Sequence, residues 1–190
     1  MEQTPLIEPE LVERTLTAAL RTGADFAEVY AEDKRSTSVG LDDGRIEQVT
    51  SGRDRGAGIR VIRGETTGFA HTSDLTASGL AAAASAAAAA ASRGDAEVHA
   101  VAHGRPVDAT PQAIGVAPET VGTARKVELL PRMNDAARAS GAEIVQVSAG
   151  YGDSRKRVLV ANSEGLLASD DIVRVLARIS VVADGDTGMQ

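Results

Sequence analysis

The sequence predicts an α+β protein in which antiparallel, hairpin-rich sheets carry flanking helices in two small units. Three observations support this class. Apolar residues recur at helical spacing near the start, an alanine-rich run follows later, and two long stretches alternate polar and apolar residues between Gly and Asp turns. A Pro- and Gly-containing stretch without periodicity separates the two halves. The length of 190 residues suits one ordinary core or two small domains.

The first helix is expected to begin near Pro9, because Pro is favoured in a first helical turn, and to stop at Gly23. From Ala24 the period changes to alternation, which predicts a meander of short strands. Its strongest turn signals are Asp43-Gly44 and the triplet around Gly64. The expected strands lie near residues 25–33, 35–42, 45–52, 57–63 and 66–71.

An alanine-rich helix should follow this meander and end at Ser92 to Gly94. Alanine allows a helix to approach a sheet closely, so we expect tight packing against the strands. Several residues before the helix are candidate N-caps, namely Thr72, Ser73, Asp74 and Thr76.

The predicted organisation is an amino-terminal α+β domain at residues 1–95, an irregular linker at 96–122 and the start of a second α+β region at 123–190. The linker contains prolines at 106, 111 and 118. The second region should open with a helix that Pro131 kinks or divides, because an interior Pro lacks a backbone donor.

Three strands near residues 143–150, 155–161 and 172–183 should follow, joined by Gly152-Asp153 and Ser163-Glu164-Gly165 turns. The last strand reaches a turn signal at Asp184-Gly185 and has no evident return strand. We therefore expect an unpaired edge and a sequence that is part of a longer protein.

Composition excludes several classes of function. The formal net charge is -7 and no dense Lys/Arg block occurs, which argues against nucleic-acid binding. Cysteine is absent, so neither disulfides nor thiolate metal sites can form in these residues. The polar, acidic opening is unlike a signal sequence, and the alanine run is too short for a bilayer of about 30 Å. We expect a cytoplasmic protein without membrane contact.

His99 and His103 have the i, i+4 spacing of two metal ligands on a helix. A zinc peptidase of this kind places Glu beside the first His, but this chain has Ala100, and no third ligand stands nearby. A solvated linker therefore explains the pair better than a metal site.

The other candidate groups have structural explanations that we favour over functional ones. His71 could contact a substrate, but a backbone hydrogen bond is preferred. The acidic residues Asp42, Asp43, Glu47 and Asp54 are explained by turn chemistry rather than acid/base catalysis. The glycines of SGRDRGAGIR suit a hairpin or bulge rather than a phosphate loop.

The remaining candidates are one acidic pair and two short runs of charged residues. Asp170 and Asp171 could cap a turn or bind a cation, although one pair does not make a calcium loop. The runs Asp33-Lys34-Arg35 and Arg155-Lys156-Arg157 suit solvated strand edges. We therefore expect no catalytic, cofactor-binding or metal-binding residue within this chain.

Three segments carry a resemblance to the TldD/PmbA family of zinc metallopeptidases, also described as modulators of DNA gyrase. They are GADFAEVYAE, the stretch DGRIEQVTSGRDRGAGIRVIRGETTGFAHTSDLT with the alanine-rich helix after it, and VRVLARISVVADGD. The resemblance covers nearly the whole chain, and GIRVIRGETTGFAHTSDLT is closer to the TldD branch than to the PmbA (TldE) branch.

This resemblance implies a non-catalytic amino-terminal portion of a peptidase that acts on small or unfolded peptides. The family motif His-Glu-x-x-x-His with a later Cys would lie beyond Gln190, so zinc is implied for the full-length protein only. The chain would form the wall of the cleft or the scaffold of a homodimer or heterodimer. The alternative is a non-catalytic, PmbA/TldE-like partner subunit. A factor acting directly on DNA is disfavoured by the acidic charge.

Overall fold

The computed structural model describes residues 5–92, 113–141, 143–185 and 188–189. Its helices are α1 (Pro9–Leu20), α2 (Ala77–Ala91), α3 (Thr123–Val127) and α4 (Leu129–Arg138), with a 3-10 turn η1 (Pro118–Thr120). Its strands are β1 (Phe26–Asp42), β2 (Arg45–Arg63), β3 (Thr66–Thr72), β4 (Ile144–Asn162), β5 (Leu167–Gly185) and β6 (Gly188–Met189). The predicted α+β class is confirmed.

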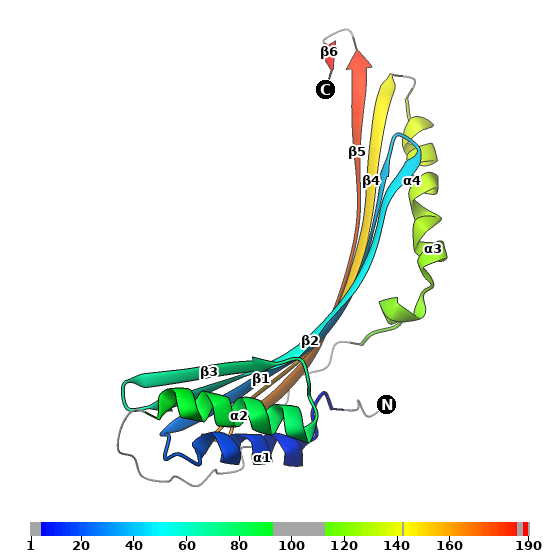
Figure 1. Ribbon diagram of the computed structural model, residues 1–190. Helices are drawn as coiled ribbons and strands as arrows, with labels where there is room; N and C mark the ends of the chain where they lie inside the picture. The colour runs from blue at the N-terminus through cyan, green and yellow to red at the C-terminus, as the bar shows by residue number, and fades with distance from the viewer. Residues whose placement is uncertain (1–4, 93–112, 142, 186–187, 190) are drawn as a thin grey trace. The chain divides into compact units, whose positions relative to one another are not determined.

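The strands form one antiparallel, six-stranded sheet in the order β3-β2-β1-β4-β5-β6 (Figure 1). The central pair, β1 and β4, is fixed by backbone hydrogen bonds at both ends. The Asp43 N–H donates to the Val147 carbonyl at 2.9 Å, and the Ser163 N–H donates to the Ala27 carbonyl at 2.8 Å. Rising residue numbers in β1 therefore meet falling numbers in β4, as antiparallel pairing requires.

Four strands are longer than the sequence predicted. The expected breaks at residues 34, 53–56 and 151–154 do not exist, because β1, β2 and β4 each continue through them. The charged residues and glycines at these positions therefore do not end the strands. A Cβ at Gly56 would lie 2.9 Å from the Thr72 carbonyl oxygen on β3, so this glycine allows close strand contact. The predicted strand at 172–183 is likewise only part of β5.

The predicted hairpin turns at Asp43-Gly44 and Gly64 are confirmed. Asp43 and Gly44 have φ of 45° and 81°, the positive values that a type I′ turn needs at both positions. The expected turn at Asp184-Gly185 is wrong, because both residues belong to β5. They pair with Met189 and Gly188, so β6 is a short return strand and the turn residues 186–187 lie outside the described part of the chain.

The chain divides into two compact units that each combine separated segments. The first consists of Met1–Asp33, Asp54–Gln112 and Arg157–Asp171, and the second of Lys34–Arg53, Ala113–Lys156 and Ile172–Gln190. The division into 1–95, 96–122 and 123–190 stays a prediction, and most of the expected linker lies outside the described residues.

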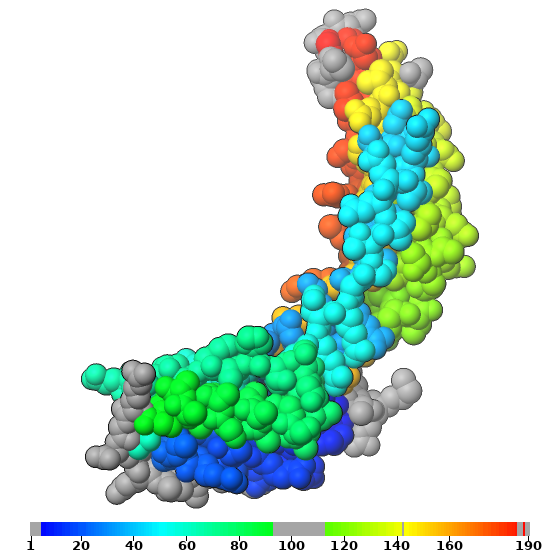
Figure 2. Space-filling model, viewed as in Figure 1, coloured from blue at the N-terminus to red at the C-terminus, as the bar shows by residue number. Residues whose placement is uncertain are grey.

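In the first unit, α1 and α2 lie against each other on one face of the sheet (Figures 1 and 2). Of the four candidate caps of α2, Thr76 is the one found, and its side chain accepts a hydrogen bond from the Gly79 N–H at 3.3 Å. Close packing of this helix is confirmed, since a Cβ at Gly68 on β3 would overlap the Ala87 carbonyl. The core beneath both helices includes Val29, Ile59 and Leu80.

In the second unit, α3 and α4 run beside β1 and β4 (Figure 1). Their small core consists of Val39, Leu41, Leu130 and Ala149. The predicted division of the helix is confirmed. The break at Glu128 places Pro131 in the first turn of α4, where a backbone donor has no intrahelical acceptor.

Part of β5 in this second unit exposes apolar side chains. Val175 is 60% exposed, Ile179 43% and Val181 45%. Their alternate spacing places them on one face of the strand. An apolar strand face is usually covered in a folded protein, whereas this one is exposed in the described part of the chain.

Candidate functional site

A buried ion pair joins α3 to the sheet of the second unit. The Lys126 Nζ lies 2.6 Å from Asp153 Oδ2, and both side chains are only 4% exposed. The same ammonium donates to Thr37 Oγ1 on β1 at 3.4 Å. Leu130, in the first turn of α4, is buried as well. Burial of two charges requires such pairing.

Tyr151 is the second partner of the Asp153 carboxylate. Burial of the phenol, together with its hydrogen bond to Asp153 and the negative charge there, raises the pKa of Tyr151 to about 12. The phenol is therefore a neutral donor at physiological pH. The Asp153 carboxylate therefore contacts both the Lys126 ammonium and the Tyr151 phenol, which makes it the centre of a polar cluster.

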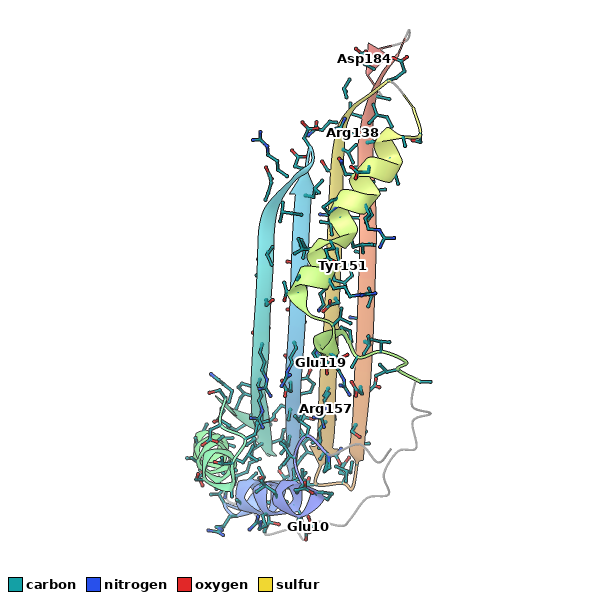
Figure 3. The ribbon with its side chains drawn as sticks, turned by 90° about the vertical axis from the view of Figure 1, so that its right-hand side faces the viewer. Glu10, Glu119, Arg138, Tyr151, Arg157 and Asp184 are labelled. Carbon is teal, nitrogen blue, oxygen red and sulfur yellow. The ribbon has the colours of Figure 1, made fainter. Side chains whose placement is uncertain are left out.

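A second ion pair lies beside this cluster. Arg155 Nη1 on β4 lies 2.6 Å from Glu119 Oε1 on η1, and the two side chains are 26% and 25% exposed. Burial acts to raise the pKa of Glu119. A backbone hydrogen bond and the charges of Arg155 and Arg35 outweigh burial, so that pKa lies below its ordinary value. Figure 3 shows Glu119, Tyr151 and Arg138 in succession along this side of the strands.

The two ion pairs, Lys126–Asp153 and Arg155–Glu119, line a pocket of about 400 Å³, which we call the basic pocket. It is formed by β1, β2, β4, η1 and α3, all within the second unit. Its charged lining consists of the basic residues Arg35, Arg53, Lys126 and Arg155 and the acidic residues Glu119 and Asp153.

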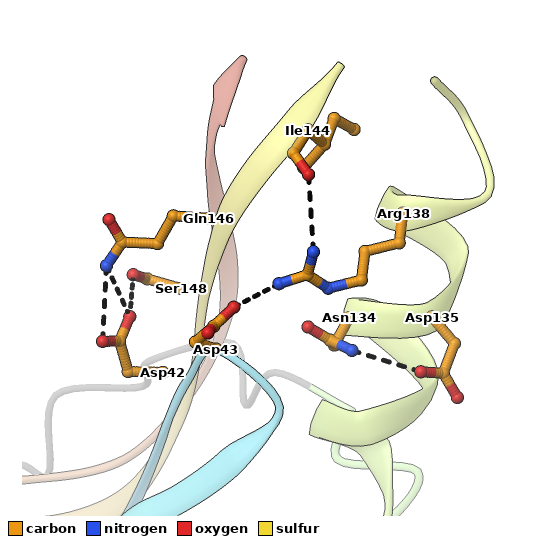
Figure 4. Close-up of polar contacts among 8 residues, drawn as sticks. All are labelled: Asp42, Asp43, Asn134, Asp135, Arg138, Ile144, Gln146 and Ser148. Carbon is orange, nitrogen blue, oxygen red and sulfur yellow. Dashed lines mark hydrogen bonds and ion pairs between the residues drawn. The ribbon is translucent and has the colours of Figure 1, made fainter. Parts of the chain in front are cut away.

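The Asp42 and Asp43 carboxylates lie at the β1–β2 turn and have separate partners (Figure 4). Asp42 accepts hydrogen bonds from Ser148 Oγ at 2.6 Å and from Gln146 Nε2 at 3.2 Å. The Ser148 bond and then the Gln146 bond lower the pKa of Asp42. Asp43 forms an ion pair with Arg138 on α4, and Arg138 also donates to the Ile144 carbonyl. These carboxylates hold the turn in place, as predicted, and they do not form an acid/base pair.

Glu47 and Asp54 are exposed on β2 and join neither group. The glycine run at residues 51–60 lies inside β2, so the expected hairpin was wrong, while the alternative of a bulge stays a prediction. His71 is exposed on β3, where its ring stacks on Phe69 with centroids 6.4 Å apart. The predicted backbone hydrogen bond of His71 remains untested.

The two charge runs do not lie on strand edges, which corrects the prediction for Asp33-Lys34-Arg35 and Arg155-Lys156-Arg157. Strands β1 and β4 are interior strands of the sheet. Asp170 and Asp171 lie within β5, where the Asp171 N–H donates to Asp170 Oδ1 at 2.8 Å. They are therefore part of a strand rather than caps at its entrance.

Within the described residues no three His, Asp or Glu side chains gather as a metal-binding group. The donors present there do not fit a zinc ion. His99 and His103 lie outside the described residues.

Sequence reasoning missed the basic pocket and its buried pair. One signal was available, because Lys126 stands four residues before the apolar Leu130 in the segment predicted to be one helix, and a lysine that is buried needs an acidic partner. The identity of that partner depends on the β1–β4 pairing, which brings Thr37 and Asp153 together across the sheet.

Two family models match the chain in succession. The first domain of the PmbA/TldA metallopeptidases matches residues 27–91, and their central domain matches residues 117–190. The fold and these matches define a protein of metallopeptidase ancestry. The chain belongs to the TldD/PmbA family.

Curated relatives agree with this assignment. A metalloprotease of Methanothermobacter thermautotrophicus is 31% identical over 166 residues, covering 87% of this chain and 36% of the relative. A metalloprotease TldD homolog of Haemophilus influenzae is 29% identical over 158 residues, covering 83% and 32%. The chain thus spans about a third of the length of these relatives.

Solved structures share the fold. A candidate modulator of DNA gyrase from Thermotoga maritima aligns with a TM-score of 0.74 and 17% identity, over 95% of this chain and 41% of that one. TldE from Thermococcus kodakarensis aligns with a TM-score of 0.66 and 14% identity, over 94% and 40%. In the described part of this chain, no helix combines the length and apolar character needed to cross a membrane.

Proposed function

We propose that this chain is the amino-terminal, non-catalytic portion of a TldD-like zinc metallopeptidase that acts on small or unfolded peptides. The observation that carries the proposal is the ordered match to the family's first and central domains in a chain about one third as long as its metalloprotease relatives. In this proposal the zinc ligands and the general base belong to sequence beyond these residues.

The role proposed for this portion is to form the wall of the substrate cleft or the scaffold of a dimer. Support comes from β5 in the second unit, whose outer edge meets β6 only at Asp184 and Gly185 among the described residues. The rest of that edge presents backbone donors and acceptors beside an exposed apolar face. Such an edge suits pairing with an extended peptide or with another subunit.

The alternative is a non-catalytic partner subunit of the PmbA/TldE kind. The similarity to TldE from Thermococcus kodakarensis motivates it, while the relatives named TldD homologs favour the catalytic branch. In either case we propose a cytoplasmic protein that assembles as a homodimer or as a heterodimer with a family paralogue. We propose neither nucleic-acid nor membrane contact.

A peptidase assay on two proteins tests this division of labour. The 190-residue chain and a version extended by the region that the longer relatives carry are incubated with an unstructured peptide, with and without a chelator. We expect no cleavage by the chain and chelator-sensitive, zinc-restorable cleavage by the extended protein. Chelator-sensitive cleavage by the chain alone would refute the proposal. An extended protein without metal or activity would favour the partner-subunit alternative.

A further inference from the structure

A second pocket of the second unit lies on the face of the sheet away from α3 and α4. Leu41 of β1 and Ala149 of β4 pack with Leu130 of α4, so strand alternation places their neighbours Asp42 and Ser148 on the opposite face. Figure 4 shows the contact between Asp42 and Ser148 on the side of the strands away from α4. We call this space of about 530 Å³ the mixed-charge pocket, and its polar lining consists of Asp42, Glu47, Gln48, Ser148, Arg178 and Ser180.

Two glycines explain why this face is hollow. Gly40 lies two residues before Asp42, on the same face of β1, and leaves the floor of the pocket without a side chain. Gly150 lies two residues after Ser148 on β4, and a Cβ there would lie 3.0 Å from Arg178 Nε and 3.3 Å from Arg178 Cγ. The arginine of β5 therefore lies against the backbone of β4, which an alanine at position 150 would prevent.

The β1–β2 side of the mixed-charge pocket is negative. The Asp42 carboxylate accepts hydrogen bonds from Ser148 Oγ at 2.6 Å and from Gln146 Nε2 at 3.2 Å. Both donors are neutral, so they orient this carboxylate and leave its charge in place. Their hydrogen bonds, that of Ser148 first, lower the pKa of Asp42, so it is ionised at neutral pH. Glu47 of β2 adds a second, exposed carboxylate to the lining.

The opposite charge comes from β5, on the far side of β4. Arg178 is exposed, and within the described residues it has no ion pair or hydrogen bond, nor does Glu47. Strand β4 stands between β1 and β5 in the sheet, which separates the strand axes that carry Asp42 and Arg178 by about 10 Å. One pocket therefore holds a cationic and an anionic side that do not neutralise each other.

This arrangement matches a ligand with both charges. A guanidinium group presents parallel N–H donors to the two oxygens of a carboxylate, and an ammonium group donates three hydrogen bonds, which suit carboxylate acceptors. We propose that the mixed-charge pocket binds a small zwitterion, a molecule with a free ammonium group and a free carboxylate, as in an amino acid or a short peptide. Its carboxylate lies on Arg178 and its ammonium group between Asp42 and Glu47. The inference is independent of the proposed peptidase function, because it involves neither zinc nor cleavage.

Titration of the 190-residue chain, followed by NMR of its backbone amides at low ionic strength, tests the proposal. The probes are alanine and trialanine. We expect saturable shifts confined to amides near Asp42, Ser148 and Arg178. Tighter binding of alanine would assign a free amino acid, and tighter binding of trialanine would assign a peptide. Failure of both probes to bind at millimolar concentration, or shifts centred elsewhere, would overturn the proposal.

Blocked peptides separate the two charges of the ligand. Trialanine amide lacks the carboxylate and N-acetyltrialanine lacks the ammonium group, so each should bind about two- to fivefold more weakly than trialanine, the range that one exposed ion pair contributes. Arg178→Gln should weaken trialanine by the same factor and leave trialanine amide unaffected. Glu47→Gln should weaken trialanine and leave N-acetyltrialanine unaffected. Equal binding of all three peptides would contradict a site for zwitterions.

Arg174→Gln is the matched control. It removes an exposed arginine four residues earlier on the same face of β5, outside the pocket lining, so affinity for trialanine should not change. A loss equal to that of Arg178→Gln would show general charge attraction and overturn the proposal.

Gly40→Ala tests the position of the ligand without changing a charge. A Cβ there would meet only the Gln48 Cβ, at 3.8 Å, which is an ordinary contact, so the fold should tolerate it. The added methyl group occupies the floor of the pocket and should weaken trialanine binding severalfold at an unchanged thermal midpoint. Unchanged affinity in this variant would contradict the assigned site.

Discussion

Substitution of Lys126 by Met should destabilise the second unit strongly, because it leaves the Asp153 carboxylate buried without its ammonium partner. Both side chains of the pair are 4% exposed. Breaking such a pair typically costs about 3–5 kcal/mol. Tyr151 still donates a hydrogen bond to Asp153, so we expect a value near the lower end, about 3 kcal/mol.

Urea unfolding measures this loss. The chain has two tyrosines and no tryptophan, so the exposed Tyr30 can be replaced by Phe to leave Tyr151 as a single fluorescent reporter in the second unit. The Arg138→Gln variant is the control, since its ion pair with Asp43 has side chains 37% and 62% exposed. Exposed pairs contribute about 0–1 kcal/mol.

A double variant, Lys126→Met with Asp153→Leu, distinguishes the buried charge from lost packing. It removes both charges, so its cost should be far smaller than the sum of the two single substitutions. The reasoning fails if Lys126→Met costs no more than Arg138→Gln, or if the two single costs simply add.

Three further outcomes are expected. In the Tyr30→Phe background, absorbance at alkaline pH should show Tyr151 titrating near pH 12 when folded and near its ordinary 10.0 when unfolded. Because the pKa is raised in the folded state, neutral Tyr151 contributes to the free energy of unfolding below pH 10, and this contribution is lost as the pH rises toward 12. A titration midpoint near pH 10 for Tyr151 in the folded protein would contradict the burial argument. Gly68→Ala should lower the free energy of unfolding by about 1–3 kcal/mol through overlap with Ala87, while Gly115→Ala, which meets no atom within 4 Å, should have little effect in the same melt. The double variant Val175→Lys, Ile179→Lys should reduce self-association of the chain in sedimentation experiments. Unchanged association would show that this face of β5 does not mediate contacts between chains.

Local signals in the sequence predicted local features. Pro9 marked the start of α1, Thr76 was among the candidate caps of α2, and Pro131 divided the last helix. The Asp43-Gly44 turn was also evident, because positive φ at two successive positions selects such residues. Each of these features depends on neighbouring residues alone.

Features that depend on distant residues were not predictable in this way. Gly152-Asp153 reads as a turn, but Asp153 is buried in a strand because Lys126 neutralises it. Gly56 similarly reads as a break, although it serves close contact with β3. The basic pocket combines residues from both charge runs with η1 and α3, and only the β1–β4 pairing reveals it.

The composition of the first core has a consequence for synthesis on the ribosome. Leu159 and Ala161 of β4 are buried with Ala27 and Val29 of β1 in that core. By the time these late residues emerge, the helices and the first three strands have already been made. Until then, the side of β1 that pairs with β4 has no neighbouring strand. The nascent chain therefore carries an unpaired, partly apolar edge of β1 until β4 has been made, and such an edge is prone to pair with other chains.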